Sequence, residues 1–293
     1  MQFVIKPGFF VVRDKVRIVD MLFVERYETM NYIINSYKNF KKYRYLLFEL
    51  VKKDIKLKYR SSYLGLLWTL LEPILTTLVL SYVMGPMLGR GDKLFVIYIL
   101  IGRLIYAFFS GATKTAMRSI RRYSGMIKKV YVPKYIYPLS AILSNFVTFA
   151  LSLIVLVIAC IIKRVEFTSQ VFLIILPLFI LLVMALGVGL FLATFSVYFR
   201  DLEYLWDVML MLIMYCSAIF YHVDTLGPSI KKLLQLNPLY NVIANCRYII
   251  FYGRDQIPMS TKYLAYSAGF SIVALIVGLI VFRKNQDKFI LHI

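Results

Sequence analysis

The sequence predicts an all-α integral membrane protein with six transmembrane helices, and three observations support this fold class. Of the 293 residues, 60% are hydrophobic and only 17% are charged, whereas soluble domains carry about 25% charged residues. Six long runs hold at most two charges each, and each is close to the ~20 residues that a helix needs to cross a bilayer. The runs do not alternate between polar and apolar residues, as the strands of a membrane β-barrel do.

The predicted spans cover residues 63–85, 94–117, 135–162, 171–198, 204–222 and 263–282. Helices suit them because lipid offers no partner to an unpaired backbone group. In the fourth span, Ala185, Gly189 and Ala193 recur every four residues, a spacing that lets helices pack closely within the subunit. Residues 233–246 are apolar but too short to span, and Asn237–Pro238 interrupts them. We expect two short re-entrant helices there, at the outer membrane face, and name them the gate helices.

Basic residues predict the orientation of the spans, because cytoplasmic loops carry the excess of Lys and Arg. The formal net charge is +20, from 35 Lys and Arg against 15 Asp and Glu. With six spans, both termini lie on one side, and that side receives 24 of the basic residues against nine on the other. Both termini are therefore predicted to be cytoplasmic. Such charge also suits nucleic acid, but the apolar runs favour membrane lipids as the partner, with no nucleic acid.

The chain divides into a predicted cytoplasmic N-terminal extension, residues 1–43, and a transmembrane domain, residues 44–293. The extension mixes charged and apolar residues and lacks the compact apolar segment of a signal peptide. Residues 44–60 predict an amphipathic interface helix, because Leu47, Leu50, Val51, Ile55 and Tyr59 recur at helical spacing. We expect its apolar side to lie in lipid. Its basic side is expected to face anionic head groups or a partner through Lys52, Lys53, Lys56 and Arg60.

Residues 118–134, between the second and third spans, carry six basic residues and no acidic one. Apolar side chains lie among these charges and Pro133 ends the segment, a pattern typical of a short amphipathic helix. Two interpretations remain open: an interfacial turn against lipid, or a docking site for a cytoplasmic protein. The candidate docking residues are Arg121, Arg122, Met126, Ile127, Lys128, Lys129 and Tyr131.

Two charged residues lie well inside predicted spans, Glu72 in the first and Arg103 in the second. A charge at the bilayer centre costs about 2.5–3.5 kcal/mol on insertion scales. Their similar depth favours a structural ion pair, and a role in the substrate path or in gating is the functional alternative. Three widely spaced cysteines and two histidines give no metal-ligand pattern, so no metal is expected.

Four stretches, in order along the chain, resemble the membrane subunits of ABC polysaccharide exporters, the type-2 permeases that move lipid-linked O-antigen, capsule or wall teichoic acid. KYRSSYLGLLWTLLEPI resembles the start of their first span, and MIKKVYVPKYIYPLS resembles their cytoplasmic coupling segment. YFRDL resembles the turn after the fourth span, and NPLYNVIANCRYIIFYG resembles their outer gate helices. The resemblance runs from about Arg44 to the end. Glu72 departs from it, since Asn is more usual at that position.

The resemblance implies a type-2 ABC permease fold and the export of a lipid-linked polysaccharide across the bacterial cytoplasmic membrane. It also implies a homodimer of permeases with two cytoplasmic ATPase subunits. The chain itself has no G-x-x-x-x-G-K-[ST] phosphate loop. We therefore expect a transport subunit without enzymatic activity or cofactor, with ATP and Mg bound by the partner ATPase.

Aromatic residues are candidates for the channel lining of such an exporter, because aromatic faces stack on sugar C–H surfaces. The alternative is that they lie at the membrane interfaces, where Trp and Tyr are enriched. The candidates in the first and fifth spans are Trp68, Tyr82, Tyr215, Phe220 and Tyr221.

Three other functions share parts of this pattern. A type-2 permease for a drug, lipid or other amphiphile would have the same interface helix and coupling segment. A polytopic membrane enzyme is disfavoured because the sequence has no HExxH, GxSxG or DxD motif. An ion-coupled secondary transporter is disfavoured because the spans hold few ionisable groups and show no evident inverted repeat.

Overall fold

The computed structural model describes residues 41–60, 62–88, 94–165, 169–223, 226–251 and 261–292. The chain divides into two units, Met1–Leu46 and Leu47–Ile293, and the second contains every site described below. Apart from residues 41–43, the predicted N-terminal extension lies outside the described residues. Within the described part of the chain every regular element is a helix.

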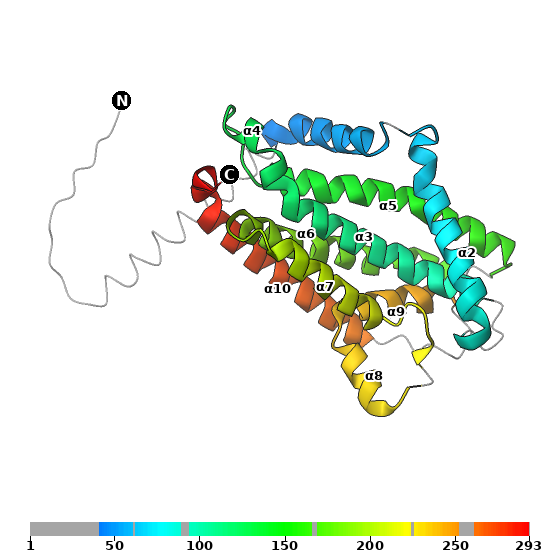
Figure 1. Cartoon of the computed structure of the whole chain (residues 1–293). Helices are drawn as coiled ribbons and strands as arrows, with labels where there is room; N and C mark the ends of the chain where they lie inside the picture. The colour runs from blue at the N-terminus through cyan, green and yellow to red at the C-terminus, as the bar shows by residue number, and fades with distance from the viewer. Residues whose placement is uncertain are drawn as a thin grey trace, which may run out of the picture. The chain divides into compact units, whose positions relative to one another are not determined.

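Residues 41–59 are helical, and we call this segment the N-terminal helix. The elements that follow it are η1 (Gly65–Leu67), α2 (Trp68–Leu88), α3 (Phe95–Arg122), α4 (Ser124–Ile127), α5 (Ile136–Ile162), η2 (Ser169–Ile174), α6 (Ile175–Tyr198), α7 (Leu202–Tyr215), α8 (Pro228–Gln235), α9 (Pro238–Ile250), α10 (Thr261–Asn285) and η4 (Gln286–Leu291) (Figure 1).

Five helical segments among the described residues are long and apolar enough to cross a membrane. They are Gly65–Pro86, Phe95–Arg122, Ile136–Ile162, Val171–Tyr198 and Thr261–Leu291. They match the first four predicted spans and the sixth, and confirm an all-helical membrane protein. The predicted ends of the spans are less accurate. The second segment continues past residue 117 to Arg122, and the last continues past residue 282 to Leu291.

The predicted fifth span, residues 204–222, is wrong as a continuous helix. Helix α7 ends at Tyr215 after 14 residues, about 21 Å of helix against a hydrocarbon core of ~30 Å. The chain then turns, and Ala218 adopts a left-handed conformation with φ +47°, which L-residues other than glycine rarely adopt. The fifth segment is therefore a short helix followed by a turn, and the apolar composition alone did not reveal the break.

The gate helices are confirmed as two short helices, α8 and α9, and they separate where Asn237–Pro238 predicted a break. Pro238 occupies the first turn of α9, where a missing backbone N–H costs nothing. The Asn237 side chain caps the helix by accepting a hydrogen bond from the Leu239 amide at 3.0 Å.

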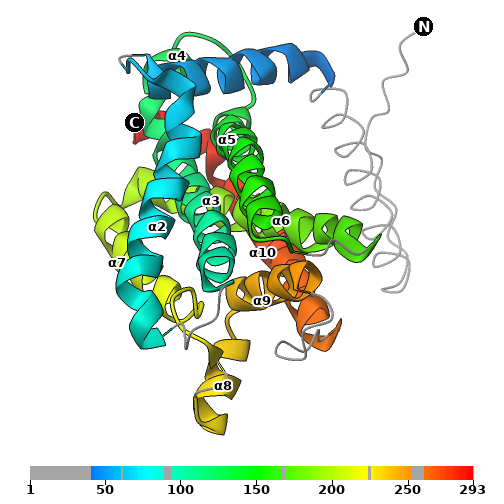
Figure 2. The same cartoon turned by 90° about the vertical axis from the view of Figure 1, so that its right-hand side faces the viewer.

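Helix α3 is the central element of the second unit. Figure 2 shows it between α2 and α7 on one side and α5 and α6 on the other, and it contacts all four as well as α9. Of the most apolar 18 residues of each helix, 67% are buried in α3, whereas only 11% are buried in α2. Helix α2 therefore presents most of its apolar surface outward, whereas α3 buries most of its surface inside the domain.

Helices α6 and α10 approach each other most closely at two glycines. A Cβ atom at Gly278 would lie 2.4 Å from the carbonyl oxygen of Gly187, so neither position has room for a side chain. The predicted small-residue stripe also packs inside the chain: Ala185 and Ala193 are fully buried. A Cβ at Gly189 would lie 2.8 Å from Ile142 Cδ1 of α5.

Candidate coupling surface, polar groove and outer gate

The C-terminal end of α3 is joined to the start of α7 by one carboxylate. Arg118 Nε donates a hydrogen bond to Glu203 Oε2 at 2.8 Å, and Arg121 pairs with the other carboxylate oxygen. One turn further along, Lys114 and Asp207 form a second ion pair at 2.8 Å. Together these contacts tie α7 to α3 at this end of the domain.

A second node joins the same end of α3 to the N-terminal helix. The Tyr123 hydroxyl donates to Asp54 Oδ1 at 2.7 Å, and Arg122 lies 3.6 Å from the same oxygen. Asp54 is buried. Burial of the phenol, reinforced by its hydrogen bond to the Asp54 carboxylate, raises the pKa of Tyr123 above its ordinary value. Lys53 Nζ lies 5.2 Å from the centre of the Tyr123 ring, within the range of a cation–π contact.

The seven predicted docking residues divide into two groups. Arg121 and Arg122 take part in the ion pairs just described, while Ile127 is buried and Met126 is half-buried. Arg122 remains half exposed despite its ion pair. The residues that are exposed and outside these ion pairs are Lys128, Lys129 and Tyr131, with Tyr131 95% exposed. The helical part of the segment, α4, is a single turn, shorter than the predicted amphipathic helix. A partner docking here would therefore meet the exposed group, which we call the coupling tip.

The N-terminal helix presents its basic side outward, as Lys52, Lys53, Lys56 and Arg60 are all exposed. The expectation that its apolar side lies in lipid is only partly met. Leu47 and Leu50 are buried within the chain, whereas Phe48 and Leu57 are exposed. The helix therefore has one group of apolar residues packed inside the protein and another exposed at the surface, whereas the sequence pattern predicted a single apolar side.

The five predicted channel aromatics do not form one cluster. Trp68 and Tyr82 lie on α2, 14 residues or about 21 Å of helix apart, and both are exposed. At the end of α7, the Tyr221 hydroxyl donates to the Tyr215 carbonyl at 2.7 Å, and Phe220 packs against the core. Their role as a channel lining stays a prediction.

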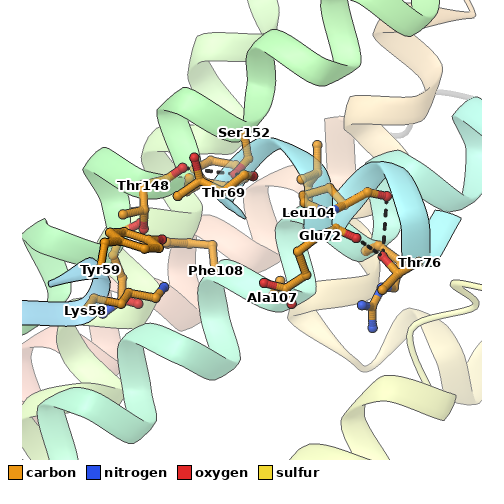
Figure 3. Close-up of a pocket in the computed structure, with 14 residues that line it drawn as sticks. Lys58, Tyr59, Thr69, Glu72, Thr76, Leu104, Ala107, Phe108, Thr148 and Ser152 are labelled. Atoms are coloured by element: carbon orange, nitrogen blue, oxygen red, sulfur yellow. Dashed lines mark hydrogen bonds between the residues drawn. The ribbon is translucent and has the colours of Figure 1, made fainter. Parts of the chain in front are cut away.

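Glu72 and Arg103 both line one cavity of about 100 Å³ between the N-terminal helix, α2, α3 and α5. We call this cavity the polar groove, and Figure 3 shows it with Glu72 among its labelled residues. The expected ion pair is absent: the salt bridges among the described residues do not include one between Glu72 and Arg103. Depth in the membrane can be read from a sequence, but the rotation of each helix about its axis cannot. The groove is lined by Lys58, Tyr59, Thr69, Glu72, Pro73, Thr76, Arg103, Leu104, Ala107, Phe108, Asn145, Thr148, Phe149 and Ser152.

Ser152 fixes one wall of the polar groove. Pro73 has no N–H to donate to the carbonyl of Thr69, four residues earlier in α2. The Ser152 hydroxyl of α5 lies 3.0 Å from that carbonyl oxygen and 3.0 Å from the Thr148 carbonyl oxygen of its own helix, and its single hydrogen is shared between these two acceptors. The freed carbonyl is thus used to join α2 to α5.

A second cavity of about 280 Å³ adjoins the groove and shares Lys58, Asn145 and Thr148 with it. Its other lining residues include Asp54 and Arg122 of the node described above. The second cavity therefore extends from the polar groove toward the C-terminal end of α3, where Arg122 lies.

Arg247 of α9 is the functional candidate that sequence reasoning missed. Its side chain is buried, and it donates to the carbonyl oxygens of Tyr98 at 3.0 Å, Ala218 at 2.9 Å and Ile219 at 3.3 Å. The guanidinium lies 3.4 Å from the centre of the Tyr98 ring. Arg247 therefore holds a gate helix, the start of α3 and the turn after α7 together. In the sequence, Arg247 is a single cation in an otherwise apolar stretch. The orientation prediction counted it only as one of the basic residues on the non-cytoplasmic side.

Comparison with known proteins agrees with this architecture. Residues 45–251 match the family model described as ABC-2 type transporter. The chain is 26% identical to the O-antigen export system permease protein RfbA of Myxococcus xanthus, over 84% of this chain and 95% of that protein. It is 24% identical to the protein of the same name from Klebsiella pneumoniae, over 83% and 93%. It is 23% identical to the polysialic acid transport protein KpsM of Escherichia coli, over 80% and 91%.

The family model spans more than half of the chain, and the region it matches contains the coupling tip, the polar groove and both gate helices. With its membrane-spanning helices, the chain belongs to the ABC-2 type transporter family of membrane proteins.

Proposed function

We propose that this chain is the permease subunit of an ATP-driven ABC transporter that exports a lipid-linked polysaccharide across the bacterial cytoplasmic membrane. One observation carries the proposal. The relatives that it matches along nearly their whole length are named for export of O-antigen and transport of polysialic acid. O-antigen, capsule and wall teichoic acid are all within this substrate class.

The proposed assembly is a homodimer of this chain with two copies of a cytoplasmic ATPase, which binds ATP and Mg. The coupling tip supports an ATPase contact, because Lys128, Lys129 and Tyr131 are exposed. Basic side chains beside an exposed aromatic residue suit an acidic, partly apolar groove on a partner.

Motion at the coupling tip would reach two other elements through α3. Arg118 and Arg121 connect the end of α3 to α7 through Glu203. Tyr123 connects it to the N-terminal helix through Asp54. A push on this end of α3 therefore moves α7 and the N-terminal helix with it, as in rigid-body switching between two arrangements of packed helices.

The excess of basic residues supports an orientation with both termini in the cytoplasm. The coupling tip then faces the cytoplasm. The gate helices face the opposite side.

Deletion of the gene in the native host tests the proposal. We expect the surface polysaccharide to disappear and its lipid-linked precursor to accumulate inside the cytoplasmic membrane, with both effects reversed by the wild-type gene. Normal surface polysaccharide together with sensitivity to amphiphilic drugs would overturn it and favour a drug or lipid permease.

A further inference from the structure

The C-terminal residues 286–292, which we call the C-terminal hook, pack back onto the ends of α6 and α10. The Phe289 side chain is fully buried. Its ring makes edge-on contacts with the rings of Phe282 in α10 and Tyr198 at the end of α6. The Tyr198 ring makes a further edge-on contact with His292. Such aromatic pairs stabilise beyond the area that they bury, so the hook is fixed on the α6–α10 pair.

The C-terminal hook also contacts the coupling segment, residues 118–134. Lys134, the last residue of that segment, is half-buried and donates from Nζ to the Gln286 carbonyl oxygen at 2.6 Å. Gln286 directly follows the last residue of α10. The partial negative charge at the C-terminal end of a helix favours a cation there. One lysine therefore fastens the end of the coupling segment to the end of α10.

The coupling tip lies between two anchors along the chain. Before it, the Tyr123 hydroxyl donates to the buried Asp54 of the N-terminal helix. After it, Lys134 donates to the C-terminal hook. A displacement of the tip therefore acts on the N-terminal helix at one anchor and on α10 at the other.

The opposite end of α10 holds the gate helices. The Tyr263 hydroxyl donates to Gln235 Oε1 at 2.7 Å, and the Tyr266 hydroxyl donates to the Leu236 carbonyl at 3.0 Å. Gln235 is the last residue of α8, and Leu236 follows it, so both bonds act on the junction between α8 and α9. Helix α10 has 25 residues, about 37 Å of helix. Figure 1 shows it running from the gate helices to the end of the domain that carries α4.

Close packing makes α10 suitable for transmitting a displacement over this length. A Cβ atom at Gly187 of α6 would lie 2.4 Å from the backbone nitrogen of Leu275 in α10. The backbones of the two helices are thus in direct contact, and we expect the pair to shift as one rigid unit.

We propose that Lys134 and Phe289 are positioning residues for coupling: they fasten the coupling segment to α10, and α10 transmits its displacement to the gate helices. This inference rests on the proposed function and adds to it a second route, besides the contacts of α3 with α7. A route of this kind requires that a change at one end alters the other end.

Hydrogen–deuterium exchange of the full chain, without ATPase, tests the route in nanodiscs of phosphatidylethanolamine and phosphatidylglycerol. Amide exchange reports local opening of the fold. Lys134→Met and Phe289→Ala should each speed exchange at least threefold in residues 124–135 and about twofold in residues 235–245. Helix α2, which packs on α3 and α5, should exchange as in the wild type.

Lys288→Met and Ile290→Ala are the matched controls, because both residues lie in the C-terminal hook and are exposed. Lys134→Arg keeps a cationic donor and should retain wild-type exchange. Unchanged exchange in residues 124–135 would overturn the anchor at Lys134. Faster exchange there with unchanged residues 235–245 would overturn the route through α10, and an equal increase in α2 would reduce the effect to a general loss of stability.

The complex with the ATPase supplies a second measurement. Lys134→Met should raise the ATP hydrolysed per polysaccharide exported about threefold, and Lys134→Arg should leave this ratio unchanged. A wild-type ratio in Lys134→Met would contradict the role in coupling. The exchange measurement needs neither ATPase nor polysaccharide, so its result is independent of the gene deletion, which alone decides whether the chain exports a polysaccharide.

Discussion

The guanidinium of Arg247 lies 3.4 Å from the ring centre of Tyr98, and the same side chain donates to the Tyr98 carbonyl at 3.0 Å. Arg247 of α9 thus contacts both the ring and the backbone carbonyl of Tyr98 at the start of α3. Carbonyl groups from the turn after α7 complete the set. The charge is satisfied by backbone oxygens and a π face, and the described salt bridges contain no carboxylate partner for it.

Replacing Arg247 with Met should destabilise the fold, because three buried carbonyl groups lose their donor. We expect the free energy of unfolding to fall by roughly 2–4 kcal/mol, measured by a sodium dodecyl sulfate titration of the protein in mixed micelles. Lys262→Met is the control, since Lys262 is exposed. A wild-type unfolding curve for Arg247→Met would show that this contact set does not stabilise the gate.

A double-mutant cycle with Gly102 tests the same contact from α3. A Cβ atom at Gly102 would lie 2.8 Å from Arg247 Nη2 and 3.2 Å from Ile219 Cγ2, so Gly102→Ala should displace the guanidinium. Once Arg247 is Met, most of that penalty should disappear, and the two changes should be non-additive. Gly85→Ala in α2 is the matched control, because nothing lies within 4 Å of the added atom. Strict additivity would contradict a direct link.

Replacing Glu203 with Gln should uncouple α7 from α3. The change keeps the shape of the side chain and removes the charge that pairs with Arg118 and Arg121. Because the site is partly exposed, the loss of stability should be small, about 1 kcal/mol or less. The main expected effect is more ATP hydrolysed per polysaccharide exported, measured in the reconstituted complex.

Asp201→Asn supplies the control for Glu203→Gln. Asp201 lies two residues away, is exposed and is absent from the salt bridges of the described residues. If both variants change the ratio of hydrolysis to export equally, the effect belongs to surface charge and the Glu203 contact has no special part in coupling.

The Tyr123–Asp54 hydrogen bond should stabilise the fold at neutral pH and lose this effect at alkaline pH. The pKa of Tyr123 is raised in the folded protein above the usual value of about 10, so the folded state holds this proton more tightly than the unfolded state. Its contribution is fully present below about pH 10 and is lost as the pH rises toward the folded-state pKa. Stability curves of the wild type and Tyr123→Phe should therefore run parallel up to about pH 9 and converge above pH 10. Curves that stay parallel at high pH would contradict this role.

Charge reversal at Lys128 and Lys129 should abolish export while leaving membrane insertion intact, because both side chains are exposed at the coupling tip. We expect at least a tenfold loss of surface polysaccharide. The matched control reverses Lys163 and Arg164, an adjacent exposed pair just after the far end of α5. Unchanged export by the Lys128 and Lys129 variant would remove the docking assignment.

The sequence predicted the elements whose signal is local. Long apolar runs predicted five spans, whose ends lie within nine residues of the observed segments, and Asn237–Pro238 predicted the break between α8 and α9. Both signals depend on hydropathy and backbone chemistry, which neighbouring residues determine. The break after Tyr215 has no such signal, since its carbonyl groups are satisfied by Arg247, about 30 residues later.

The candidate sites were predicted less completely, for a related reason. The charges of the coupling segment identified it in the sequence. They did not show that Arg121 pairs with Glu203 while Lys128 stays exposed, because that depends on where the start of α7 lies in the fold. Glu72 and Arg103 were placed at similar depth and do line one groove, yet the pairing expected between them did not form. Contacts between distant segments decide both cases.

ATP-dependent translocation by the purified chain in proteoliposomes, with and without its ATPase, tests the central claim most directly. The account predicts that the permease alone neither hydrolyses ATP nor moves a lipid-linked glycan, and that adding the ATPase with ATP and Mg restores movement. Hydrolysis or translocation by the permease on its own would contradict it.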